Sequence, residues 1–254
     1  MNEVKKPLVS VIMPVYNGAP FVRQAAESAL RQSMGDLELI IVDDCSTDGS
    51  AAIIARLAQM DSRIRPIYAQ ANAGVAASRN IGLNTAKGDF TAFLDCDDIW
   101  LPNKLELQLA RMREKDADIC YASYSFINKS GEPVGRPYIV PEKTDYRSLL
   151  YENVIGCSTA LFRRSSLGGL RMDGNYMHED YVFWLEALKI PVRAAGIRDV
   201  LVKYRLEGRS SNKIRAARER WRIYRRAQGL GLLSSALCFI HYAARGAVKR
   251  IPRR

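Results

Sequence analysis

Short apolar runs alternate with amphipathic stretches over the first hundred residues. The runs predicted to form buried strands are residues 8–13, 37–42, 64–68 and 90–94. Between them lie three stretches with apolar residues at helical spacing, the first opened by Pro20 and the third covering residues 75–85. Strands and helices that alternate in this way predict an α/β fold with a parallel sheet and right-handed crossovers.

The chain loses this regular alternation after Asp98. A helix is predicted at residues 103–115, a strand at 119–127 and a hairpin turn at 130–133. Residues 136–147 show no periodicity, and we expect them to form a loop that closes over a ligand. The remaining predicted elements are a strand at 159–162, a helix at 179–188 and a strand at 200–205.

Positive charge is concentrated at one end of the chain. The formal net charge of the 254 residues is +11, and fifteen Lys or Arg but only two Asp or Glu lie between Lys203 and Arg254. We predict a body of residues 1–205, divided into halves 1–98 and 99–205, followed by a basic tail of residues 206–254. This asymmetry indicates a polyanionic surface as the partner of the tail.

The cysteine content favours a reducing compartment. The five cysteines are odd in number and scattered, and they form no Cys-x-x-Cys pair, which argues against a disulfide framework and against a zinc site. The apolar run near the N-terminus is short and is interrupted by Pro14, so we interpret it as a strand and not as a signal peptide. We therefore expect a cytoplasmic protein.

An acidic turn follows the fourth predicted strand. Asp95, Asp97 and Asp98 place three carboxylates within four residues. Because like charges disfavour one another's ionisation, we expect a cation beside them. Mg²⁺ and Mn²⁺ prefer oxygen ligands and often bind one or two carboxylates together with a substrate's phosphates. An isolated Asp-x-Asp sequence, however, is more often a solvated acidic loop.

Two other predicted strands also end in polar residues. Tyr16 and Asn17 follow the first strand, and the second ends at Asp43 and Asp44. The carboxyl ends of parallel strands share one edge of a sheet, where open α/β sheets bind ligands, so these residues should converge with the acidic turn. A helix that begins after Gly74 enters the same edge, and its N-terminus would suit a phosphate.

The order and spacing of these motifs resemble the family 2 glycosyltransferases, inverting enzymes with the GT-A fold. The resemblance covers residues 7–205, and the matching stretches are VSVIMPVYNG, ELIIVDDCSTDGS, NAGVAASRNIGL, GDFTAFLDCDDIWLP and HEDYVFWL. It implies transfer of a sugar from a nucleotide-diphosphate donor, with a UDP-sugar favoured. The acceptor would be a glycan, which we expect to be lipid-linked, in cell-surface polysaccharide or lipopolysaccharide synthesis.

The resemblance also implies roles for individual residues. Asp180 matches the family's general base, and Asp97 with Asp95 would bind a divalent metal, Mn²⁺ or Mg²⁺. Glu179 and Trp184 are candidates for contact with the acceptor. The residues implied in nucleotide binding are Pro14, Val15, Tyr16, Asn17, Asp44, Asn72, Gly74, Arg79 and Asp95. This division suits an inverting transfer, which needs a carboxylate to take the acceptor's proton and a cation at the departing diphosphate.

Three of these assignments have alternatives. Glu179 and Asp180 would also suit the first turn of a helix, where acidic side chains interact favourably with the helix dipole. Trp184 would also suit the core or the wall of a pocket. Many relatives carry a His shortly after the last Tyr-Arg of the matching region, whereas Glu207 stands there in this chain. Glu207 either ligates the metal or faces solvent.

The basic tail contains an uncharged segment, residues 227–244. Its apolar residues at helical spacing are Leu230, Leu233, Leu237, Ile240 and Ala244, with basic residues before and after. The segment is barely long enough to span a bilayer and contains polar residues. We therefore expect residues 222–254 to lie on an anionic membrane, which would make the protein peripheral on the cytoplasmic face of the inner membrane. The alternative is a helix that packs its stripe on the body. No recognised nucleic-acid-binding module accompanies the charge, so we expect no nucleic-acid partner.

Two other classes of function stay open from the residues alone. A strand that ends in Asp95-x-Asp97 superficially resembles the aspartyl-phosphate phosphatases, but these continue with Gly and Thr or Val, whereas Asp98 and Ile99 follow here. A non-catalytic membrane- or glycan-binding module on the same fold is the other alternative. Turnover that disappears in Asp180→Asn while nucleotide binding survives would exclude such a module.

Overall fold

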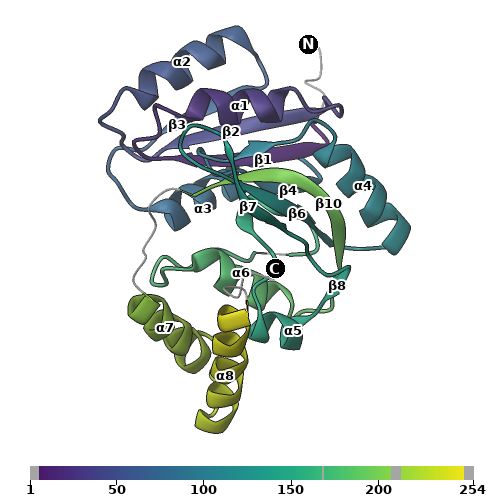
Figure 1. The fold of residues 1–254 in the computed structure, drawn as a ribbon. Coiled ribbons are helices and arrows are strands. Elements are labelled where there is room, and N and C mark those ends of the chain that lie inside the picture. Colours follow the sequence, from purple (N-terminus) through teal and green to yellow (C-terminus); the bar gives the residue numbers. More distant parts are fainter. Residues whose placement is uncertain (1–5, 168, 207–212, 249–254) are drawn as a thin grey trace.

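The computed structural model describes residues 6–167, 169–206 and 213–248, and the strands in these ranges form one mixed sheet (Figure 1). The strand order is β3-β2-β1-β4-β9-β6-β10-β5, with β7 beside β6 and β8 beside β10. The strands of the first half are β1 (Val9–Val15), β2 (Leu37–Asp43), β3 (Ile64–Tyr68) and β4 (Phe90–Phe93). Those of the second half are β5 (Ile99–Trp100), β6 (Ile119–Ile127), β7 (Pro133–Tyr138), β8 (Lys143–Thr144), β9 (Leu161–Arg163) and β10 (Ala194–Arg205).

Helices cover both faces of this sheet, and each face has its own core. The helices on one face are α1 (Val22–Leu30), α2 (Ser50–Met60) and α4 (Lys104–Lys115). The other face carries α3 (Val75–Thr85), α5 (Tyr146–Tyr151) and α6 (Glu179–Ala187). Neighbouring residues of β1 belong to different cores, since Val11 and Met13 pack in the first and Ile12 in the second. Every residue of β1 and β2 is therefore buried.

The parallel arrangement predicted for the first half is confirmed. β1 pairs in parallel with β2 and with β4, and β2 pairs in parallel with β3. In the second half, β9 is antiparallel to both β4 and β6 and thereby joins the two halves of the sheet. β10 runs parallel to β6, and the short β5 is antiparallel to β10.

The prediction of a loop at residues 136–147 is wrong. β7 ends at Tyr138, β8 covers Lys143–Thr144, and α5 begins at Tyr146. β7 pairs with β6 alone among the described strands, and five of its six residues are exposed. An exposed edge strand buries neither face, so no apolar alternation marks it, and it tolerates proline. The hairpin turn predicted between β6 and β7 is confirmed by the hydrogen bond from the Gly131 amide to the Asn128 carbonyl.

Two strand boundaries also differ from the prediction. β10 begins at Ala194 and not at Val200, and its pairing with β6 shifts in register between Ile197 and Val200. That irregularity breaks the period-two pattern in the first part of the strand. β9 begins at Leu161, because a 3-10 turn at Cys157–Thr159 occupies the start of the predicted strand.

The described part of the tail forms helices that pack against the body. α7 (Lys213–Arg222) continues into a π-helical turn (Ile223–Ala227), and α8 (Leu232–Val248) follows. Ile223, Tyr224 and Cys238 are buried in the core that contains α5 and α6. The Tyr224 hydroxyl donates a hydrogen bond to the Leu150 carbonyl at 2.6 Å.

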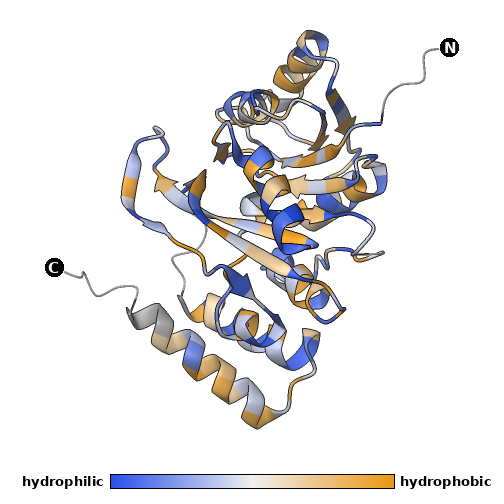
Figure 2. Cartoon of the chain, turned by 90° about the vertical axis from the view of Figure 1, so that its right-hand side faces the viewer, coloured by the Kyte–Doolittle hydropathy of each residue, from blue (hydrophilic) through white to orange (hydrophobic). Residues whose placement is uncertain are grey.

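The exposed residues of α8 include several large apolar side chains. Leu233 is 77% exposed, and Leu232, Leu237 and Ile240 are also exposed, whereas Ser235 is buried. Figure 2 shows the hydrophobic segments along this helix. The tail therefore packs on the body, but of the stripe that the sequence alternative assigned to that contact Leu230 packs there, whereas Leu233, Leu237 and Ile240 are exposed. Within the described ranges, no helix has the combined length and apolarity needed to span a bilayer.

Candidate active site

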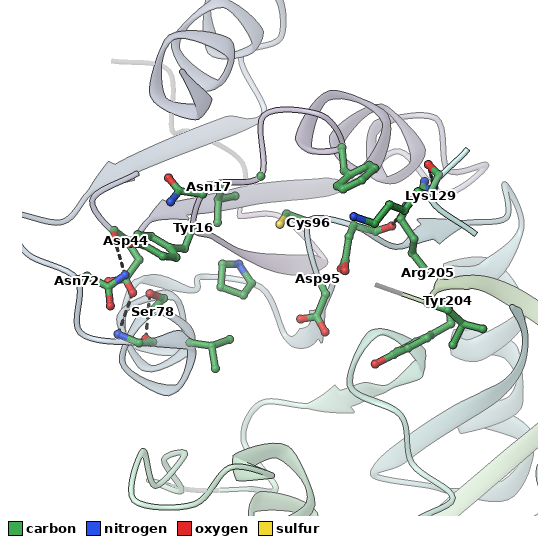
Figure 3. Close-up of a pocket in the computed structure, with 18 residues that line it drawn as sticks. Tyr16, Asn17, Asp44, Asn72, Ser78, Asp95, Cys96, Lys129, Tyr204 and Arg205 are labelled. Carbon is green, nitrogen blue, oxygen red and sulfur yellow. Dashed lines mark hydrogen bonds between the residues drawn. The ribbon is translucent and has the colours of Figure 1, made fainter. Parts of the chain in front are cut away.

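An open pocket of about 640 Å³ lies at the carboxyl ends of β1, β2 and β4 (Figure 3). This confirms that the polar ends of the three strands converge. The pocket residues that the sequence singled out are Pro14, Val15, Tyr16, Asn17, Asp44, Asn72, Gly74, Asp95 and Asp97. Arg79, Glu179, Asp180 and Trp184 do not line it.

One end of the pocket is built on hydrogen bonds between loops. The buried Asp44 carboxylate accepts hydrogen bonds from the backbone amides of Ala73 (2.9 Å) and Gly74 (2.8 Å), so it ties the loop before α3 to the end of β2. Gly74 has a φ of +88°, a conformation that glycine adopts without steric cost. The Asn17 side-chain oxygen accepts a hydrogen bond from the Thr47 amide (2.8 Å). Tyr16 is 53% exposed, and its ring is thus available for stacking at this end.

The acidic turn divides its three carboxylates between the pocket and the protein interior. Asp95 and Asp97 line the pocket, whereas Asp98 is buried and accepts a hydrogen bond from the Arg205 amide at 2.9 Å. Burial, together with the charges of Asp95 and Asp97, raises the pKa of Asp98 well above its usual value. The turn is held from below by Ser158, whose hydroxyl accepts a hydrogen bond from the Asp95 amide (3.0 Å). Asp95 and Asp97 are therefore the carboxylates of the turn that a ligand in the pocket would meet.

Arg79 lies behind the pocket. It is 1% exposed and forms ion pairs with two carboxylates, Asp95 at the end of β4 and Glu179 at the start of α6, the second at 2.6 Å. Burial opposes its charge, but the neighbouring Asp95 and Glu179 hold the pKa of Arg79 well above its usual value. The structure thus gives Arg79 two protein partners in place of a position on the pocket wall.

The start of α6 brings the predicted base close to the acidic turn. Glu179 is buried against Arg79, and the half-buried Asp180 follows it in the first turn of the helix. The pKa of Tyr204, a residue of the pocket wall, is raised by burial and by the charges of Asp98, Asp95 and Asp180. The carboxylates of Asp180 and of the acidic turn therefore all lie close enough to Tyr204 to raise its pKa.

Two predictions about the acceptor are corrected by this geometry. Trp184 is fully buried, with its ring edge-on to Phe93 and Phe162, so it is a core residue and does not stack on a sugar. Glu179 is occupied by its ion pair with Arg79 and is not presented to an acceptor. Glu207, the alternative metal ligand, lies outside the described residues.

The pocket wall opposite the strand ends contains residues that the sequence analysis did not identify. Lys129 comes from the β6–β7 turn, and Tyr204, Arg205 and Leu206 come from the end of β10. In the sequence, Tyr204 and Arg205 stand out only as the Tyr-Arg pair that precedes Glu207. A lysine in a hairpin turn carries no sequence feature that distinguishes it from a solvated residue.

A model of the glycosyl transferase family 2 matches residues 10–170, which is more than half of the chain. The chain is a family 2 glycosyltransferase. This family 2 glycosyltransferase is 38% identical over 248 residues to "Putative teichuronic acid biosynthesis glycosyltransferase TuaG" of Bacillus subtilis, covering 97% of this chain and 98% of the relative. The family assignment decides against both a phosphatase and a non-catalytic module.

A second relative and a solved structure extend this likeness. "UDP-Glc:alpha-D-GlcNAc-diphosphoundecaprenol beta-1,3-glucosyltransferase WfgD" of Escherichia coli is 36% identical over 218 residues, which are 84% of each chain. The crystal structure of S. aureus TarS 1-349 in complex with UDP-GlcNAc superimposes with a TM-score of 0.73 at 19% identity, covering 92% of this glycosyltransferase and 71% of TarS 1-349. The fold is accordingly the predicted GT-A fold.

Proposed function

We propose that this glycosyltransferase moves a sugar, with inversion, from a UDP-sugar to a lipid-linked glycan during synthesis of a surface polysaccharide. The observation that supports this most directly is the pocket itself. It combines an end suited to a nucleoside with two half-buried carboxylates of the acidic turn, and the acidic start of α6, outside the pocket, is connected to that turn through Arg79. The preference for a UDP-sugar and for a lipid-diphosphate acceptor rests on the name of the Escherichia coli relative.

The nucleoside would lie at the end of the pocket formed by the loops after β1 and β2. Tyr16 offers an exposed ring on which a base can stack. The loop that contains Asn72 and Gly74 is fixed by Asp44, which leaves the backbone at this end preorganised. A preorganised loop loses little conformational entropy when the nucleotide binds.

A divalent metal, Mn²⁺ or Mg²⁺, fits the middle of the pocket, at the acidic turn. Asp97 and Asp95 are hard oxygen donors on the pocket wall, and the phosphates of the donor would complete the coordination. In the described part of the chain, no cluster of three His, Cys, Asp or Glu residues is arranged to hold a metal. When bound, the ion would neutralise charge on the departing diphosphate.

Asp180 would act as the general base. Its carboxylate would accept the proton of the acceptor hydroxyl while the oxygen forms a bond to the anomeric carbon of the sugar. The bond from that carbon to the diphosphate breaks on the opposite side, and the electron pair leaves with UDP. Arg79 and Glu179 would hold the start of α6 at the correct distance from the acidic turn, because they connect it to Asp95.

The exposed stripe of α8 would bind the enzyme to the cytoplasmic face of the membrane that carries the acceptor. Leu232, Leu233, Leu237 and Ile240 are exposed on one helix, and α7 before it carries several arginines. Apolar side chains flanked by cations suit the interface of an anionic bilayer. A lipid-linked acceptor would then be held at the same surface as the enzyme.

Calorimetric titration with UDP, GDP and dTDP tests the donor site. We expect one of these nucleotides, UDP, to bind in the presence of Mn²⁺, and binding to be lost with a chelator or in Asp97→Ala. Lys143→Ala, a change of an exposed residue in β8 outside the pocket, should leave the affinity unchanged. The absence of metal-dependent binding of all three nucleotides would refute the assigned site.

Sedimentation with vesicles tests the membrane face. We expect wild-type protein to sediment with phosphatidylglycerol vesicles, and the double variant Leu233→Ser, Leu237→Ser to remain in solution. Met60→Ser removes an equally exposed apolar side chain at the end of α2 and should have no effect. Equal sedimentation of the wild type and the double variant would show that this stripe does not bind the membrane.

A further inference from the structure

The polar residues of the pocket are distributed along its length. Figure 3 shows Tyr16, Asn17, Asp44 and Asn72 at one end, Lys129, Tyr204 and Arg205 at the other, and Asp95 and Cys96 between them. A nucleoside diphosphate whose base lies at the first end directs its phosphates past Asp95 toward the second. The negatively charged diphosphate of the leaving group would therefore lie toward the end that contains Lys129.

Arg205 at this end is committed to protein partners. Its guanidinium donates to the Asp97 carbonyl (2.8 Å), to the carbonyls of Asn128 and Lys129 (both 2.8 Å) and to the Gln24 side chain (3.0 Å). These bonds connect the acidic turn to the β6–β7 turn, because one arginine binds the backbone of both. Arg205 thus fixes the position of the Lys129 backbone relative to that of Asp97. Little of the donor capacity of Arg205 remains for a ligand.

The backbone that carries Lys129 is also rigid. In the β6–β7 turn, the Gly131 amide donates to the Asn128 carbonyl (3.0 Å), the Asn128 amide donates to the Glu132 carbonyl (2.9 Å), and Gly131 has a φ of +86°. The side chain on this fixed turn is exposed and lines the pocket. Among the described lining residues, Lys129 and Arg205 are the cations.

We propose that Lys129 binds the diphosphate of the nucleotide-sugar donor at its β-phosphate, the phosphate to which the sugar is bonded. This inference rests on the proposed function, since it assumes a nucleoside diphosphate in the pocket. The ammonium group of a lysine donates charge-assisted hydrogen bonds to phosphate oxygens. Its long side chain allows it to keep these bonds while negative charge develops on the departing diphosphate. The donor site then spans both halves of the body, because Lys129 belongs to residues 99–205 whereas the loops at the nucleoside end belong to residues 1–98.

Affinities for UDP and UMP in saturating Mn²⁺ test the proposal, with the wild type, Lys129→Ala, Lys129→Arg and Lys143→Ala compared by calorimetry. We expect Lys129→Ala to weaken UDP binding about tenfold and UMP binding by less than about threefold, because UMP lacks the second phosphate. Lys129→Arg should keep most of the affinity for UDP, and Lys143→Ala should behave as the wild type. Equal melting temperatures would show that the exposed turn tolerates these changes.

The possible failures are distinguishable. If Lys129→Ala binds UDP as tightly as the wild type, or loses UDP and UMP affinity equally, Lys129 does not bind the β-phosphate and the proposal is overturned. If the wild type itself binds neither nucleotide, the donor site is wrong and the proposal fails with it.

Discussion

Arg79→Met is expected to be among the most destabilising single substitutions in this protein. Arg79 is almost completely buried and neutralises both Asp95 and Glu179. Removing one partner of a buried ion pair typically costs about 3–5 kcal/mol, because the remaining charge stays buried without compensation. Here Asp95 has a side chain that is 20% exposed and recovers some hydration, whereas Glu179, at 7%, recovers little. We therefore expect a loss of about 3–4 kcal/mol, dominated by Glu179.

Urea unfolding at neutral pH, with linear extrapolation, measures this loss. The double variant Arg79→Met, Glu179→Gln should recover about 1–3 kcal/mol relative to Arg79→Met, because it removes the uncompensated carboxylate. Arg31→Met is the matched control, since Arg31 forms an exposed pair with Glu27 and its loss should cost at most about 1 kcal/mol. An unfolding free energy of Arg79→Met equal to that of Arg31→Met would refute the reasoning.

Two further predictions concern the cores on either side of the sheet. Burial lowers the pKa of Lys104 to about 7 from its usual value of 10.5, so the unfolded chain binds more protons between these values and the wild type should gain stability with rising pH across that window. Relative to Lys104→Met, urea unfolding between pH 7 and 10 should show a gain of up to about 1.4 kcal/mol per pH unit, and parallel profiles of the two proteins would contradict this. Gly82→Ala would place a Cβ 2.3 Å from Ile12 Cγ2, so overpacking of about 1–3 kcal/mol should outweigh the gain in helix propensity. Thermal melts should show a lower Tm, and a higher Tm would show that α3 moves away from β1 at little cost.

The parallel half of the fold was predictable because its physical causes are local. A strand buried on both faces is a continuous apolar run, and Asn17, Gly49 and Gly74 mark the turns between strands and helices. Those strand ends share a sheet edge by topology alone, so most of the pocket followed from the sequence. β7 was not predictable, because an edge strand supported by β6 needs no apolar pattern of its own.

The parts of the site that sequence reasoning missed depend on contacts between distant segments. Arg79 and Glu179 are a hundred residues apart, and nothing local shows that their charges meet. Trp184 lies in a helix that is buried almost all round, so helical position alone did not indicate its burial among aromatic rings. Lys129 reaches the pocket only because Arg205 holds its turn against the acidic turn.

The most direct test of the proposed function is transfer by Asp180→Asn. Wild-type enzyme would be incubated with Mn²⁺, a panel of UDP-sugars and GlcNAc-diphosphoundecaprenol, with UDP release measured and the anomeric configuration of the product read by NMR. We predict an inverted product from the wild type, and a rate about 10²–10⁴-fold lower in Asp180→Asn with unchanged UDP affinity. Glu186→Gln, on the same helix, should retain the wild-type rate. A retained configuration, or an Asp180→Asn rate within tenfold of the wild type, would contradict Asp180 as the base of an inverting transfer.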